Sequence, residues 1–149
     1  TPLHNIKLID LLLQKGVNIN AIDNMGNTAL HIAAQRGDKD VVKRLLDLNA
    51  NVNVRNKNGD NELLICCIEF REKYTEFSSD YFVDVFKLLI NHGCNVNVAA
   101  NNGWVPLHFA TFFSLREIVK LLVAEKALVT KFTKAALFGR CDFIQRIDY

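Results

Sequence analysis

The feature that most constrains this 149-residue chain is a motif that returns along it at intervals of 33 and 44 residues. Gly26, Gly59 and Gly103 each open a similar segment. After Gly26 the sequence reads TALHIAAQRG, then VVKRLL, then NANVN, and after Gly103 it reads VPLHFA and then IVKLL. A recurring unit of this length is typical of a solenoid, in which each unit buries its apolar face against its neighbours.

The spacing of apolar residues predicts two helices in each unit. The first helix begins near Thr28 and its equivalents, and the second carries a Val-Val…Leu-Leu stripe. The second helix ends at Gly16, Asn49 or Gly93, residue types that accept a left-handed conformation. Finger-like turns then lead into the next unit, around residues 23–26, 56–59 and 101–103. We expect one domain over residues 1–149, with full units at 22–54, 55–98 and 99–130 and partial units at 1–21 and 131–149.

In these motifs the chain resembles the ankyrin repeat family, whose unit runs G-x-T-P-L-H-x-A-A, then V-V-x-x-L-L, then G-A-x-x-N. The resemblance implies an all-α helical solenoid of stacked helix-turn-helix repeats with finger-like turns. It also implies a protein–protein interaction scaffold that binds a protein partner through its concave face and finger tips. The identity of that partner does not follow from the sequence, and we expect the chain to be a monomer.

The ends depart from the pattern. Residues 1–4 look like the opening tetrapeptide of a first helix, yet residues 5–20 already match 38–53. About six residues of a first helix are therefore missing, either because the first repeat is shortened or because residues are absent from the sequence. Residues 131–149 have a polar second helix, as expected of a terminal capping repeat that faces water.

The middle unit carries an insertion of eleven residues near 71–81. This segment mixes charges with Ser78 and Ser79 and has no long apolar stripe, so we expect an exposed loop and the least ordered internal segment. The same unit has Asn61 and Leu64 where the first full unit has Thr28 and His31, which predicts weaker helix capping there.

Composition excludes several classes of function. No apolar run approaches the roughly 20 residues that cross a bilayer, so membrane insertion is not expected. The net charge is only +2 and no basic block is present, so nucleic-acid binding is not expected either. All seven glycines fall at turns or helix ends, which leaves none for a phosphate-binding loop.

The four cysteines do not form a metal or redox motif, since no pair has C-x-x-C spacing. Cys66 and Cys67 stand where Ala33 and Ala34 stand one repeat earlier. We interpret them as reduced core residues, and the compartment as intracellular and cytoplasmic. The amino-acid usage is typical of AT-rich genomes, and if the chain is an effector of such an organism, the compartment is the cytoplasm of a host cell. No cofactor and no metal are expected.

The histidines invite a catalytic interpretation, since imidazole is the usual general base near neutral pH. His31 and His108, however, occupy the same place in two repeats. In the family resembled here this imidazole hydrogen-bonds the turn backbone, which implies a structural role. No acid, base and nucleophile converge at motif spacing, so we do not expect an enzyme.

The candidate partner-binding residues follow from the register of the resemblance. They are Asn24, Met25, Asn27, Gln35 and Arg36, then Lys57, Asn58, Asp60, Ile68 and Glu69, then Asn101, Asn102, Trp104, Phe112 and Phe113. Large aromatics on an otherwise polar face are candidates for interface anchors. The alternative is that Phe112 or Phe113 packs beneath the inserted segment.

Two further questions stay open at this stage. The chain can also be the recognition or regulatory domain of a larger protein, such as a host-directed effector, an enzyme or a ubiquitin-ligase adaptor. Asn20, Asn53 and Asn97 lie where ankyrin repeats resembling this one can be hydroxylated, although turn structure is the simpler explanation of these amides.

Overall fold

The computed structural model describes residues 2–73, 79–113 and 115–125 of the chain. This part contains seven α-helices and no β-strand. In chain order the helices are α1 (Pro2–Gln14), α2 (Ala29–Arg36), α3 (Lys39–Asp47), α4 (Glu62–Lys73), α5 (Ser79–Asn91), α6 (Pro106–Phe112) and α7 (Arg116–Ala124).

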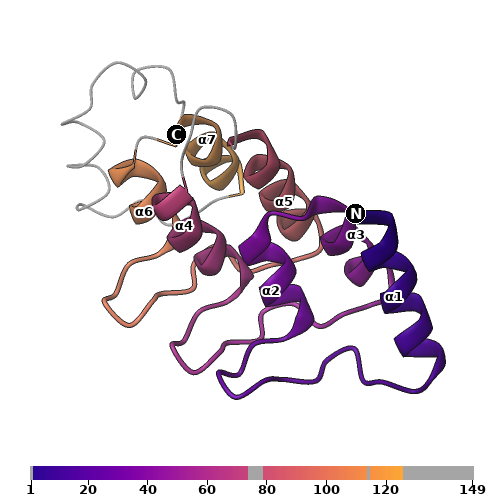
Figure 1. Cartoon of the computed structure of the whole chain (residues 1–149). Helices are drawn as coiled ribbons and strands as arrows, with labels where there is room; N and C mark the ends of the chain where they lie inside the picture. Colours follow the sequence, from indigo (N-terminus) through magenta and orange to yellow (C-terminus); the bar gives the residue numbers. More distant parts are fainter. Residues whose placement is uncertain (1, 74–78, 114, 126–149) are drawn as a thin grey trace.

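The helices form two layers (Figure 1). The inner layer runs α2, α4, α6, and the outer layer runs α1, α3, α5, α7, with each helix packed on the next one of its layer. Long turns project from one side of the stack, next to the inner helices (Figure 1). The predicted all-α repeat solenoid is therefore confirmed.

The outer helices supply the apolar stripe that joins the repeats into one core. In α3 the stripe consists of Val41, Val42, Leu45 and Leu46, all buried. The corresponding residues Val85, Phe86 and Leu89 of α5 and Ile118, Val119 and Leu122 of α7 are also buried. Because each stripe packs against its neighbours, the repeats share a continuous core and no unit is closed by itself.

The cysteines pack in this core as the repeat alignment predicts. Cys66, Cys67 and Cys94 are buried free thiols, and Cys141 lies outside the described residues. Burial in apolar surroundings raises the pKa of all three thiols well above the ordinary value. They therefore remain protonated and unreactive at neutral pH.

The ends of the outer helices have the expected left-handed backbone. Gly16, Asn49 and Gly93 have φ angles of 83°, 61° and 84°. At Asn49 this conformation is uncommon for a residue with a side chain, and asparagine is among the types that adopt it most readily. The residue pattern thus correctly marks where each repeat turns back toward the fingers.

The N-terminal repeat differs from the one predicted, in which residues 1–4 open a first helix that is separate from the helix of residues 5–20. Residues 2–14 form one continuous helix, so the tetrapeptide extends the outer helix. Proline is tolerated in the first helical turn, and the residues after His4 continue without a helix breaker. Among the described residues, no inner helix precedes α2.

The insertion near 71–81 was expected to be a loop, and this prediction was largely wrong. Helix α4 continues to Lys73 and α5 begins at Ser79, so the two helices include six of the eleven inserted residues. Phe82 explains the early start of α5, because it is 5% exposed and its ring would lie 3.4 Å from a Cβ placed on Gly37. It thus extends the apolar stripe of α5 by one turn. Residues 74–78 lie outside the described part.

The expectation of weaker capping at α4 was also wrong. The backbone N–H of Leu64 donates to Asn61 Oδ1 at 3.1 Å, which caps the helix without a threonine. The amide Nδ2 of Asn61 donates to the carbonyl of Asn95 at 3.0 Å, so one side chain also joins two repeats. The repeat boundary at 130 and the capping repeat at 131–149 fall outside the described residues.

Candidate functional site

A polar groove lies on the finger side of the stack, between the first two full repeats. It has a volume of about 190 Å³. We call it the finger-side groove, and it is lined by Asn27, Gln35, Asn56, Asn58, Asp60, Ile65, Ile68 and Glu69. Six of these eight residues are among the predicted contacts, and the repeat register therefore brings them together as expected.

The finger turns that border this groove are held by asparagine and aspartate side chains. Asp23 Oδ1 accepts from the N–H groups of Met25 and Asn27, both at 2.9 Å. Asn56 Oδ1 accepts in the same way from Asn58 and Asp60, both at 3.0 Å. Each finger is thus fixed by its own first polar residue, which leaves its tip exposed for contacts.

Neighbouring fingers are tied to each other. Asn56 Nδ2 donates to Asn27 Oδ1 at 2.9 Å, and the N–H of Lys57 donates to the carbonyl of Met25 at 2.9 Å. Gly26 makes this approach possible, because a Cβ there would lie 3.2 Å from the Lys57 nitrogen and its φ is +77°. The fingers therefore form one connected surface.

The floor of the groove is polar and paired. Gln35 Nε2 of α2 donates to Glu69 Oε1 of α4 at 2.8 Å, which links two inner helices across the groove. Ile65 and Ile68 supply apolar wall beside them. A partner segment would therefore meet both hydrogen-bonding groups and apolar surface here.

An aromatic cluster continues this side of the stack in the third full repeat. The ring centroid of Trp104 lies 5.0 Å from that of Phe109 and 5.3 Å from that of Phe112. Phe112 and Phe113 are 5.0 Å apart in an edge-to-face arrangement. We call these four residues the aromatic patch. Phe112 is 46% exposed, whereas Trp104 and Phe113 are partly buried against the core.

Trp104 is partly exposed, as expected for it, and the rest of its side chain is buried. Its ring is in contact range of Phe109, which is itself 6% exposed, so part of the indole belongs to the core. The exposed anchor of the patch is Phe112. Phe109 was not among the predicted contacts. The equivalent residue of the first full repeat, Ile32, is also apolar, so the sequence pattern did not single out Phe109 as unusual.

Two other predicted contacts, Asp60 and Arg36, differ from the rest in burial or in the groove that they line. Asp60 is only 6% exposed, although it reaches the finger-side groove. Burial raises the pKa of its carboxyl above 3.8, while nearby His31 and Arg55 act in the opposite direction. Arg36 is exposed but does not line this groove. Asn24, Met25, Lys57, Asn58, Asn101 and Asn102 are exposed on the fingers, as expected.

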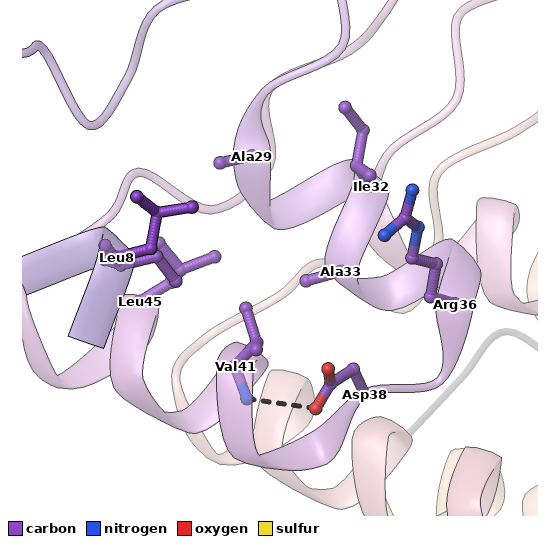
Figure 2. A pocket seen from close by; sticks show the side chains of 9 residues that line it. Leu8, Ala29, Ile32, Ala33, Arg36, Asp38, Val41 and Leu45 are labelled. Carbon is purple, nitrogen blue, oxygen red and sulfur yellow. Dashed lines mark hydrogen bonds between the residues drawn. The ribbon is translucent and has the colours of Figure 1, made fainter. Parts of the chain in front are cut away.

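Arg36 lies in a second groove, at the N-terminal end of the stack (Figure 2). This N-terminal groove has a volume of about 250 Å³ and is lined by Leu8, Ile9, Ala29, Ile32, Ala33, Arg36, Asp38, Val41 and Leu45. Figure 2 shows Leu8 from α1, Ala33 from α2 and Val41 from α3 around its opening. No feature of the resemblance predicted this site.

The hydrogen bonds of the Thr-Ala-Leu-His segment show what its histidine does. His31 Nδ1 accepts from the N–H of Thr28 at 3.0 Å, and its Nε2 lies 3.3 Å from the carbonyl of Asp60. The bond to Thr28 leaves Nε2 as the protonated nitrogen, which donates to Asp60 and joins two repeats. His31 is 1% exposed. Its role is structural, as expected.

These repeats match a known sequence family. The family model for ankyrin repeats, which describes three copies, matches residues 2–78 and 56–133. This chain belongs to the ankyrin repeat family. A crystal structure of an ankyrin repeat domain from Acinetobacter baumannii is similar, with a TM-score of 0.75, 31% identity, and coverage of 85% of this chain and 62% of that one.

Curated ankyrin relatives are much longer than this chain. Tyrosine-protein kinase HTK16 of Hydra vulgaris is 34% identical over 83% of this chain and 16% of its own length. Putative ankyrin repeat protein L91 of Acanthamoeba polyphaga mimivirus is 36% identical over 64% of this chain and 14% of its own length. The chain thus spans about one sixth of these relatives. Ankyrin repeats are in general non-catalytic modules for protein–protein interaction.

The described residues contain neither a metal-ligand cluster nor a membrane-spanning helix. Within them, no three His, Cys, Asp or Glu side chains are grouped so that they could hold a metal ion. In the same part of this ankyrin chain, none of the helices has the length and apolar character needed to cross a bilayer.

The asparagines after each outer helix have the turn role expected of them. The N–H groups of Asn20 and Asn97 donate to Asn18 Oδ1 and Asn95 Oδ1, both at 2.9 Å. Asn53 is engaged more deeply, since its Oδ1 accepts from the N–H of Asn95 at 2.6 Å and its Nδ2 donates to the carbonyl of Gly93 at 3.0 Å. The two bonds of Asn53 join consecutive ankyrin repeats, whereas those of Asn20 and Asn97 hold a turn within one repeat. Hydroxylation of Asn20, Asn53 or Asn97 stays a prediction of the resemblance.

Lowering the pH from 7.5 to 5.5 is expected to destabilise the stack through His108. Its Nδ1 accepts from the N–H of Val105 at 3.2 Å, and burial lowers the pKa of the imidazole from its ordinary 6.5. The unfolded chain therefore binds the proton first, and stability falls below about pH 6.5 by at most about 1.4 kcal/mol per pH unit.

The variant His108→Asn should reduce the dependence of the free energy of unfolding on pH between 7.5 and 5.5, as measured by denaturant melts. If this pH dependence is unchanged in the variant, other groups cause it. Asp60, with its raised pKa, acts with the opposite sign, because its carboxyl binds a proton more readily in the folded chain than in the unfolded one.

Proposed function

We propose that this ankyrin chain recognises a protein partner through its finger side, with the aromatic patch as anchor and the finger-side groove as the polar part of the interface. The observation that carries the proposal is the register of the inner helices. Phe112 of α6 occupies the position of Gln35 in α2 and Ile68 in α4, both of which line the groove. The groove and the patch therefore lie along one side of the inner layer.

The chemistry of this side suits a protein surface. Interfaces are anchored by a few large side chains, and aromatic residues are enriched among them. Phe112 offers an exposed ring supported from behind by Trp104 and Phe113, so little conformational entropy is lost when a partner covers it. Fixed finger turns and the Gln35–Glu69 pair supply directional hydrogen bonds around this anchor.

The partner is to be found by its contact with Phe112. A photo-crosslinking amino acid placed at Phe112 should form an adduct in a cell lysate, whereas the same group at Lys43, exposed on α3 of the outer layer, should not. Adducts at Lys43 and none at Phe112 would move the binding surface to the outer layer and contradict the proposal.

Phe112→Ala is expected to weaken binding of the captured partner by about 2 kcal/mol or more, roughly thirtyfold in dissociation constant. Its effect on the free energy of unfolding should stay below about 1 kcal/mol, because the ring is half exposed. Binding can be followed by the emission of Trp104, the single tryptophan, which lies next to Phe112. Trp104→Ala serves as the comparison, and we expect it to cost more stability. If wild type and Phe112→Ala bind the partner with equal affinity, the aromatic patch is not part of the interface.

A second candidate function is that of a recognition or regulatory domain within a larger protein. It is favoured by the relatives, in which the matching segment makes up about one sixth of the chain. Reading the complete open reading frame on both sides tests this, since a catalytic or membrane segment beside the repeats would support it. As a free domain, we propose that the chain is monomeric and intracellular; sedimentation velocity over a range of concentrations tests the former.

A further inference from the structure

Two of the finger turns end in an Asn-Gly pair, the dipeptide in which asparagine loses its side-chain amide most readily. The pairs are Asn58-Gly59 and Asn102-Gly103, whereas the first finger has Met25 before its glycine. Glycine has no Cβ, so its backbone nitrogen can approach the side-chain carbon of the preceding residue without steric hindrance. Both asparagines are exposed on the fingers, and water therefore reaches them.

The reaction at such a pair needs only water. The glycine nitrogen gives up its proton and forms a bond to Cγ of the asparagine, the Cγ–Nδ2 bond breaks, and ammonia leaves with a proton. Water then opens the resulting succinimide ring. Hydrolysis at Cγ gives aspartate, whereas hydrolysis at the backbone carbonyl carbon gives isoaspartate, in which the backbone continues through the side chain.

The side chain of Asn102 is held in place. Its Oδ1 accepts from the N–H of Trp104 at 2.9 Å. The first residue of this turn is Ala100, which has no side-chain acceptor, so Asn102 has the capping role that Asp23 has in the first finger. To reach the nitrogen of Gly103, the Asn102 side chain must first give up this bond.

The side chain of Asn58 does not have that role. Asn56 Oδ1 accepts instead from the N–H groups of Asn58 and Asp60, both at 3.0 Å. In the described part of the chain, the side-chain amide of Asn58 itself makes no hydrogen bond. It can therefore turn toward Gly59 without losing one.

The surroundings of the glycine nitrogen differ as well. The N–H groups of Gly59 and Gly103 both donate to the first residue of their turn at 2.9 Å, so the loss of this bond is common to the two sites. Beside Gly59 lies Arg55, whose Nε donates to the Gly59 carbonyl at 2.8 Å, and the counterpart of Arg55 in the next repeat is Ala99. A fixed guanidinium favours loss of a proton from a neighbouring group, while the carboxyl of Asp60 has the opposite effect.

We propose that Asn58 is a site of spontaneous deamidation through a succinimide, and that in the folded chain it reacts faster than Asn102. The product adds a carboxylate to the finger-side groove, which Asn58 lines together with Asp60 and Glu69. Modified and unmodified molecules therefore differ in the charge of this groove. The modification does not rest on the function proposed above, since it depends on the finger turn and on water.

The test incubates the 149-residue chain in mildly alkaline buffer made with heavy-oxygen water, followed by digestion and tandem mass spectrometry. Aspartate and isoaspartate with one heavy oxygen should accumulate at position 58. The rate there should be about fivefold that at position 102, the factor that one hydrogen bond corresponds to. Asn61, which is 0% exposed, should stay unmodified. In urea the rates at positions 58 and 102 should become similar, because no turn then holds either side chain.

Two variants test the explanation by the finger turns, and a denaturant melt checks that each is folded. Ala100→Asn supplies a capping side chain to the third finger, so the rate at Asn102 should rise toward that at Asn58. Arg55→Gln should slow the reaction at Asn58, and a faster reaction would contradict the effect assigned to Arg55. Equal rates at Asn58 and Asn102 in the folded chain, aspartate without isoaspartate, or a difference that persists in urea would overturn the proposal.

Discussion

Leu89→Ala is expected to lower the free energy of unfolding by about 4 kcal/mol, and Leu45→Ala by only about 2–3 kcal/mol. The two leucines occupy the same place in consecutive outer helices, and both are almost fully buried. Leu89 is enclosed, so its loss leaves a cavity that cannot collapse. Leu45 borders the N-terminal groove (Figure 2), where neighbouring side chains can move into the space.

Urea melts followed by far-ultraviolet circular dichroism measure the difference. Leu122→Ala, the matching position of α7, provides a third point of the series. If Leu45→Ala costs as much as Leu89→Ala, the N-terminal groove beside Leu45 is closed in solution.

Asn61→Ala is expected to cost about 2–4 kcal/mol, a large effect for a small polar side chain. The substitution removes both the cap of α4 and the bond to Asn95, and it leaves the buried N–H of Leu64 and a carbonyl oxygen without these partners. Asn61→Thr keeps a capping oxygen but no donor for Asn95, so it should cost less, about 1 kcal/mol.

The two variants separate the functions of this side chain. A cost for Asn61→Thr equal to that of Asn61→Ala would show that the contact with Asn95 carries the stability and the cap contributes little. A cost below about 0.5 kcal/mol for Asn61→Ala would mean that water satisfies the released groups.

The sequence predicts the repeat architecture well because its signals are local. Left-handed positions such as Asn49, and the Val-Val…Leu-Leu stripes of the outer helices, depend on a few neighbouring residues and recur in order. The same register places Gln35, Ile68 and Glu69 in one groove, since equivalent positions of stacked helices lie on the same side.

The predictions that failed depended on contacts between repeats. Phe82 starts α5 early because Gly37 of the preceding repeat leaves room for its ring, and no local pattern reveals that space. Asn61 replaces the Thr/His pair by bonding to Asn95 in the next repeat. The N-terminal groove lies beside α2 where, among the described residues, no earlier inner helix is present, and the sequence pattern alone did not indicate a groove there.

The lengthened pair α4 and α5 also has a consequence for folding. In a chain of nearly equivalent units, one unit can dock in the place of another, and misassembly of this kind is a characteristic error of repeat proteins. Among the described glycines, Gly37 is the one against which Phe82 packs, and the positions equivalent to Phe82 in α3 and α7 are Asp38 and Leu115, which carry no ring. We infer that this contact favours one order of units, because a register-shifted stack would leave the Phe82 ring without the space beside Gly37.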